Sequence, residues 1–275
     1  MLRACRLIRG YTKRGILSIF FPASILIFAM VMFLSVWDEM KTGLSSSGVY
    51  YYMRFAYATT MYFLMIICTI PSALQFSKEW RSSYYLFSCS RIGRLGYSVS
   101  LIFSAALLAF LTAVAGGTLF LLISSLKVPL ISDGDPGLIY CIEAYANGGL
   151  MAEGKYFLYY FLMIVAQSAL CALMSAFAVL VSVFFTDPFV TSVSPMMVFI
   201  IITNLMSIAG IPQLANPYYV FSTNGYNFRL MNPNEKYNFS VASCLYPFLY
   251  LIVFLVILTF LVNISLKNRY EGREV

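Results

Sequence analysis

Six long apolar segments without a single charged residue dominate the sequence. Each is at least as long as the run of about 20 apolar residues that a helix needs to cross the hydrocarbon core of a bilayer. A chain with six such segments is expected to fold as an all-α, polytopic membrane protein, with one transmembrane domain over residues 1–275. The predicted transmembrane helices are Gly15–Trp37, Phe55–Phe76, Tyr97–Leu126, Tyr156–Phe185, Phe189–Ile208 and Cys244–Leu266.

The composition of the chain excludes several classes of function. Of the 275 residues, 61% are hydrophobic and 11% are charged, whereas soluble proteins have about 25% charged residues. These values exclude a soluble enzyme and a nucleic-acid-binding protein. Because histidine is absent, histidine-activated nucleophiles and histidine-ligated zinc are excluded as well. No metal or cofactor is expected in the chain, and no acid, base or metal cluster marks an intramembrane active site.

The distribution of basic residues predicts the orientation of the chain in the membrane. If the N-terminus is cytoplasmic, twelve of the 18 Lys and Arg residues lie inside and six lie outside. Cytoplasmic segments carry such an excess of basic residues in membrane proteins. We therefore expect both termini to be cytoplasmic, and the net charge of +7 to reflect topology rather than an anionic partner.

The first 14 residues predict a basic amphipathic helix on the inner leaflet. At 100° per residue its basic side chains share one arc, and most apolar side chains, including Leu7, Ile8 and Tyr11, share the other. Such a helix places its cations near anionic lipid headgroups. It either anchors the chain or belongs to a docking surface for a cytosolic partner, and both interpretations stay open. The basic residues are Arg3, Arg6, Arg9, Lys13 and Arg14.

Residues 77–96 form the only substantial cytoplasmic loop that the topology predicts. Trp80, Tyr84 and Phe87 repeat at helical spacing in this loop. We expect a short helix along the membrane surface, with these aromatic residues facing the bundle. The charged residues Glu79, Arg81, Arg91 and Arg94 would then be accessible to another protein. A solvated charged loop is the alternative.

The outer segment 209–243 is too apolar for a solvated loop, but Pro212 and Pro217 interrupt it. Broken apolar segments of this kind are tolerated where they pack against protein or line a cavity. The segment is expected to be re-entrant or interfacial, and to form either an outer gate around Pro212, Asn216 and Pro217 or a cap without a gating role. Cys141 and Cys244 also face the outside and are candidates for a disulfide.

A sequence that resembles a nucleotide-binding loop occurs at Gly149–Tyr156. It matches G-x-x-x-x-G-K, but Tyr156 replaces the Ser or Thr that binds magnesium, and no strand is predicted before it. The segment also faces the outside in the predicted topology. The chain itself is therefore not expected to hydrolyse ATP.

Local patterns predict how the spans begin, bend and pack. Asp187 followed by Pro188 predicts a helix N-cap with proline at the first position. Proline residues within three spans predict kinks, at Pro22, Pro71 and Pro195. Small residues every four positions predict close helix packing, at Ala105, Ala109, Ala113 and Gly117 and at Ser168, Ala172 and Ala176.

The order of these elements resembles the ABC-2 type exporter permeases over essentially the whole chain. Phe76, Glu79, Ser82-Ser83 and Ser90-Arg91 lie where that family has its motif after the second span, although the family's Gly and Pro are absent here. Asn216-Pro217 is similar to the Asn-Pro that often precedes the family's last helix.

The resemblance implies a membrane subunit of an ABC exporter in a bacterial plasma membrane. It would pair with a second, identical or similar permease and with two ATPase subunits that bind ATP, and it would export an amphipathic substrate, most simply a peptide. The alternative is an ion-coupled secondary transporter or channel, which the uncharged spans disfavour. The expected contacts with the ATPase are Arg3, Arg6, Arg9, Lys78, Glu79, Arg81, Ser90, Arg91 and Arg94.

Overall fold

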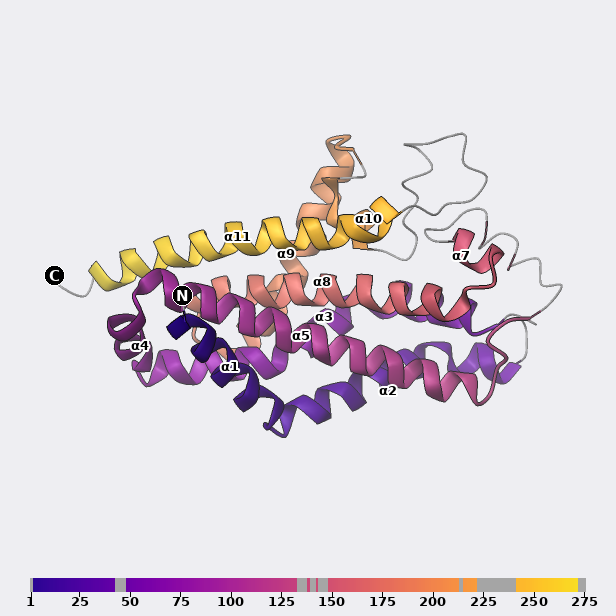
Figure 1. The fold of residues 1–275 in the computed structure, drawn as a ribbon, viewed down its shortest axis with the longest axis horizontal. Helices are drawn as coiled ribbons and strands as arrows, with labels where there is room; N and C mark the ends of the chain where they lie inside the picture. The colour runs from indigo at the N-terminus through magenta and orange to yellow at the C-terminus, as the bar shows by residue number, and fades with distance from the viewer. Residues whose placement is uncertain are drawn as a thin grey trace.

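The structure, a computed structural model, is helical in every regular element that it describes (Figure 1). It describes residues 2–42, 48–132, 138, 142, 148–212, 215–221 and 241–271. The helices are α1 (Leu2–Ile16), α2 (Phe20–Thr42), α3 (Val49–Arg81), α4 (Tyr84–Ile92), α5 (Arg94–Ser125), α7 (Gly148–Ala152), α8 (Tyr156–Phe184), α9 (Pro188–Ile208), α10 (Pro217–Phe221) and α11 (Val241–Glu271).

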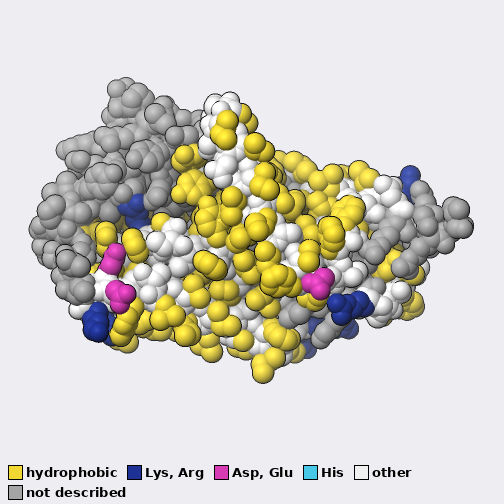
Figure 2. Space-filling model, turned by 180° about the vertical axis from the view of Figure 1, so that it is seen from behind, with side chains coloured by type: hydrophobic (Ala, Val, Ile, Leu, Met, Phe, Trp, Pro, Cys, Tyr) yellow, Lys and Arg dark blue, Asp and Glu magenta, His cyan; other side chains and the backbone are white. Residues whose placement is uncertain are grey.

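Six of these helices, α2, α3, α5, α8, α9 and α11, are long and apolar enough to cross a membrane. The prediction of an all-α chain with six such helices is therefore confirmed. On the face that Figure 2 shows, hydrophobic side chains cover the middle of the molecule, and the charged side chains lie nearer its two ends. The N-terminal helix, α4 and the end of α11 lie toward one end of the bundle, and α7 lies toward the other (Figure 1).

Helix α8 occupies the centre of the bundle, in contact with α3, α5, α9 and α11. Its contact with α5 is the most extensive in the described structure. Small residues make this close approach possible, and the Ser175 hydroxyl donates a hydrogen bond to the Ala105 carbonyl oxygen across it, at 3.2 Å. The prediction that these rows of small residues pack closely against other helices is thus confirmed. All of the residues in the two rows are buried: Ala105, Ala109, Ala113, Gly117, Ser168, Ala172 and Ala176.

The first predicted span begins later than expected. Gly15 and Ile16 belong to the end of α1, and α2 starts only at Phe20. Between the helices the chain turns, and the backbone N–H of Phe21 bonds to the Ser18 carbonyl at 3.1 Å. Pro22 therefore lies in the first turn of α2, where its missing N–H costs no helical hydrogen bond, and no kink is needed there.

Helix α9 begins as the sequence predicts. The Asp187 carboxylate accepts hydrogen bonds from the backbone N–H groups of Phe189, at 2.8 Å, and Val190, at 3.1 Å. Pro188 occupies the first helical position. This arrangement satisfies two N–H groups that have no partner within the helix.

The predicted helix over 77–96 is divided into three parts. Helix α3 continues to Arg81, a turn follows in which Ser83 has a φ of 56°, and α4 ends before Gly93, with a φ of 82°. The turn changes the helical register, so Tyr84 and Phe87 are 44% and 52% exposed while Tyr85 is buried. The expectation that Tyr84 and Phe87 face the bundle is wrong for this reason.

The structure describes only part of the outer segment 209–243. Residues 222–240, Cys141 and the side chain of Cys244 lie outside the described part. The re-entrant path and the disulfide stay predictions. The short helix α10 packs beside α11, where the Tyr250 hydroxyl donates to the Ala215 carbonyl oxygen at 3.0 Å.

Candidate functional site

A buried carboxylate connects three helices at the end of the molecule that contains α4. Glu79, near the end of α3, accepts hydrogen bonds on its Oε2 atom from two tyrosine hydroxyls. The Tyr11 hydroxyl of α1 is 2.9 Å away, and the Tyr97 hydroxyl of α5 is 3.1 Å away. The Ser88 hydroxyl of α4 also bonds with Tyr11. One acidic side chain therefore ties α1, α3 and α5 together, with α4 joined through Tyr11.

The surroundings of Glu79 change its acidity. The side chain is only 9% exposed, and this burial raises the pKa of its carboxyl group above the ordinary value. Hydrogen bonds from Tyr11 and Tyr97 and the charge of Arg14 act in the opposite direction but do not cancel the effect. Burial also raises the pKa of Tyr11 far above its usual range, with a further contribution from Glu79. The Tyr11 hydroxyl thus keeps its proton and remains a donor.

Helix α1 packs on the bundle along one narrow face. Tyr11 and Gly15 are buried on this face and Leu7 is half-buried. A Cβ atom at Gly15 would overlap the Leu108 side chain of α5, so glycine permits the close approach. The cations Arg6 and Arg9 lie outside this face and are exposed. Cys5, from the predicted apolar arc, is exposed as well, so the amphipathic division of α1 stays a prediction.

A hollow of about 600 Å³ separates the exposed side of α1 from α4. Arg6 and Leu7 line it from α1, and Ser90 and Arg91 are among the residues that line it from α4. The Arg91 guanidinium carbon lies 5.3 Å from the centre of the Phe87 ring, a distance typical of a cation–π contact. The described residues that line this hollow include two cations beside aromatic and hydroxyl groups, and none of these described residues is acidic.

The structure brings some of the expected partner contacts together and separates others. Arg6, Ser90 and Arg91 share the hollow. Arg81 and Arg94 are exposed at the helix ends that precede and follow α4. Arg9 lies in a different groove, and the side chains of Arg3 and Lys78 are outside the described part.

Glu79 requires a correction. It was expected among the exposed contacts, but the structure buries its carboxylate against Tyr11 and Tyr97. A charged side chain in a short polar segment is normally expected to be exposed. That expectation is wrong here because Glu79 is buried against a donor, Tyr11, that is 68 residues away in the sequence. Tyr97 and Ser88 were missed for the same reason, since no local pattern reveals a distant partner.

The three residues proposed for an outer gate lie in and beside the connection between α9 and α10. Asn216 is buried, and its amide nitrogen donates to the Thr203 carbonyl oxygen of α9 at 3.3 Å. Its side-chain oxygen accepts from the Tyr218 backbone N–H at 3.0 Å. Pro217 is buried at the start of α10, while Pro212 is exposed. Asn216 and Pro217 therefore start α10 and hold it against α9, and a gating role stays a prediction.

Comparisons with known proteins add no assignment. No family model matches the chain, and neither the curated proteins nor the solved structures include a significant match.

Proposed function

We propose that the chain is the membrane subunit of an ATP-driven exporter, with α1 and α4 forming the surface that docks a cytosolic ATPase. The observation that carries this proposal is the hollow between α1 and α4, with Arg6, Ser90 and Arg91 on its walls. It lies at the end of the bundle where the predicted topology places the cytoplasm. The two cations on its walls, Arg6 and Arg91, suit an acidic or carbonyl-rich helix end of a partner.

The Glu79 network gives this surface a connection to the membrane-spanning helices. Tyr11 belongs to α1, which forms one wall of the hollow, and Tyr97 belongs to the start of the transmembrane helix α5. A displacement of α1 by a bound ATPase would therefore act on α3 and α5 through Glu79. We propose Glu79 as a positioning residue for this coupling rather than as a direct contact.

The remaining parts of the function rest on the resemblance of the sequence to ABC-2 type permeases. A second permease copy, two ATPase subunits and export of an amphipathic peptide from a bacterial cell complete the proposed assembly. The apolar surface in the middle of the molecule supports its place in a membrane (Figure 2), with both termini proposed to be cytoplasmic.

The test is purification of the tagged chain from its native membrane, followed by identification of bound proteins and an ATPase assay. We expect a chain with a complete nucleotide-binding loop, and we expect Arg91→Glu to lower its recovery about thirtyfold or more, since disrupting a buried interfacial charge pair costs about 2 kcal/mol or more. Lys155→Glu is the matched control, because Lys155 is exposed at the start of α8, at the opposite end. Equal losses for both variants would refute docking at the hollow.

An ion-coupled secondary transporter is the second candidate, and the buried carboxyl of Glu79 favours it. Burial raises the pKa of this group, as expected of a carboxyl that takes up and releases protons in a transport cycle. Transport by the purified chain in vesicles would then follow a proton gradient, need no ATP and disappear in Glu79→Gln. Transport that needs ATP and an ATPase subunit would exclude this candidate.

A further inference from the structure

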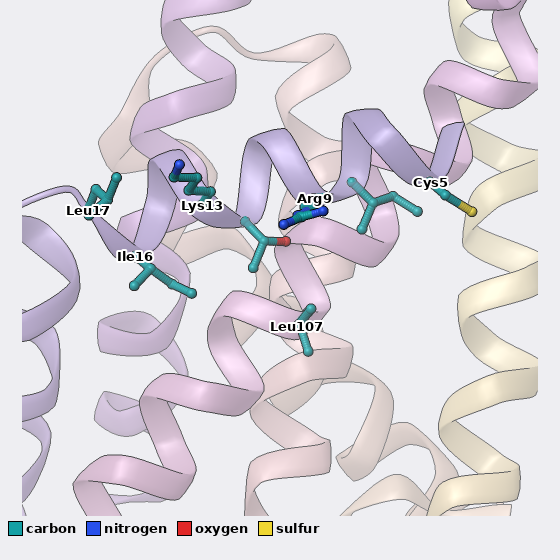
Figure 3. Close-up of a pocket in the computed structure, with 8 residues that line it drawn as sticks. Cys5, Arg9, Lys13, Ile16, Leu17 and Leu107 are labelled. Atoms are coloured by element: carbon teal, nitrogen blue, oxygen red, sulfur yellow. The ribbon is translucent and has the colours of Figure 1, made fainter. Parts of the chain in front are cut away.

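A second groove, distinct from the α1–α4 hollow, runs along another side of α1. Its volume is about 540 Å³, within the range of about 300–1,000 Å³ typical of small-molecule sites. Six of its lining residues come from one stripe of α1, and Leu107 of α5 lies across from them (Figure 3). The lining residues are Cys5, Ile8, Arg9, Thr12, Lys13, Ile16, Leu17 and Leu107.

The groove combines an apolar wall with two cations. Ile16, Leu17 and Leu107 are 40%, 75% and 41% exposed, so a row of large apolar side chains remains uncovered. Arg9 and Lys13, one helical turn apart, are exposed on the same side of α1, and α1 contains no acidic residue. A ligand that satisfies both features needs an anionic group attached to a hydrocarbon chain.

A buried hydroxyl without a partner provides an independent indication of a ligand. Thr12 lines the groove and is only 9% exposed, yet its Oγ1 atom has no hydrogen-bond partner within the described structure. An unpaired buried hydroxyl costs about 1–3 kcal/mol. A phosphate or ester oxygen in the groove would accept from Thr12 while Arg9 and Lys13 balance its charge.

We propose that this groove binds one anionic phospholipid of the inner leaflet. The phosphate lies beside Arg9, Thr12 and Lys13, and an acyl chain follows the apolar side chains toward Leu107. Cys5 and Ile16 are 11 residues apart on α1, which corresponds to about 16 Å along a helix at 1.5 Å per residue. The groove therefore follows α1 over a length that an acyl chain can occupy, with Leu107 of α5 as its opposite wall. The site requires no ATPase partner.

The test measures lipid binding to the purified full chain in detergent by native mass spectrometry. Phosphatidylglycerol and phosphatidylcholine with identical acyl chains are compared, and inorganic phosphate is added as a competitor. We expect tighter binding of phosphatidylglycerol, lowered about fivefold each by Arg9→Gln and Lys13→Gln. Arg6→Gln removes the same charge from the α4 side of α1 and should change the affinity less than twofold.

Two further measurements locate the lipid. Thr12→Val, which keeps the shape of the side chain, should weaken phosphatidylglycerol binding, and Leu107→Trp should weaken both lipids by filling the groove. A phosphatidylglycerol with a photoreactive acyl chain should label Ile16, Leu17 and Leu107. Equal affinity for both lipids, an equal effect of Arg6→Gln, displacement by millimolar phosphate, or labelling spread evenly over the apolar surface would each overturn the proposal.

Discussion

Replacement of Glu79 separates the two roles of its side chain, as an acceptor for hydroxyl groups and as a buried charge. Glu79→Ala removes the acceptor for Tyr11 and Tyr97, each within 3.1 Å of the same oxygen. A buried hydroxyl left without its partner costs about 1–3 kcal/mol. Ser88 still bonds with Tyr11 and reduces the loss there. We therefore expect Glu79→Ala to lower the free energy of unfolding by about 2–4 kcal/mol.

Glu79→Gln keeps an acceptor oxygen and removes the charge, so its effect depends on pH. Because burial raises the pKa of Glu79, the folded chain binds this proton more tightly than the unfolded chain. The resulting stabilisation is fully present below the ordinary pKa of about 4.3. It is lost as the pH rises from that value through the raised one. As the pH rises through this window, the free energy of unfolding of the unchanged chain should therefore fall relative to that of Glu79→Gln, by at most about 1.4 kcal/mol per pH unit.

The measurement is unfolding in mixed micelles at a series of pH values, with hydrogen exchange of residues 2–16 as a local probe. Exchange in α1 should rise in Glu79→Ala and stay low in Glu79→Gln. Glu153→Gln is the matched control, because this exposed carboxylate pairs with Lys155 at the surface, where such pairs contribute about 0–1 kcal/mol. Equal destabilisation by Glu79→Ala and Glu79→Gln at all pH values would refute the proposed role of the two tyrosines.

Three other substitutions test the packing of the helices. Gly117→Leu would place its side chain against Tyr57 and Ile164 and should lower the free energy of unfolding by about 1–3 kcal/mol, measured by the same unfolding assay. Asp187→Ala removes the N-cap of α9 and should cost about 1 kcal/mol, whereas Asp187→Asn should retain most of the stability. Asn216→Leu removes the bonds to α9 and α10 and should increase proteolysis after residue 209, and unchanged cleavage would contradict this role.

The sequence predicts the number of spans well because charge and length alone determine which segments can enter a bilayer. It misplaces the start of α2 because the turn at 17–19 consists of residues as apolar as the helix that follows. Hydropathy carries no signal for such a break. The N-cap at Asp187 could be predicted because its hydrogen bonds are local.

The candidate site could be predicted only in part. Arg6, Ser90 and Arg91 lie beside one another, as expected from two segments that the predicted topology places on the same face of the membrane. The burial of Glu79 and the unpaired hydroxyl of Thr12 depend on contacts between helices that are far apart in the sequence. Such contacts leave no periodicity, so a single sequence cannot reveal them.

The connections on either side of α4 limit how this helix can move. Gly93 alone separates the last residue of α4 from the first residue of α5, and only Ser82 and Ser83 separate α3 from α4. Consecutive Cα atoms are about 3.8 Å apart, so the facing ends of α4 and α5 can never be more than about 7.6 Å apart. A force on α4 can therefore move this helix only slightly on its own. A larger displacement of α4 must move the ends of α3 and α5 with it, or unwind a turn of one of these helices.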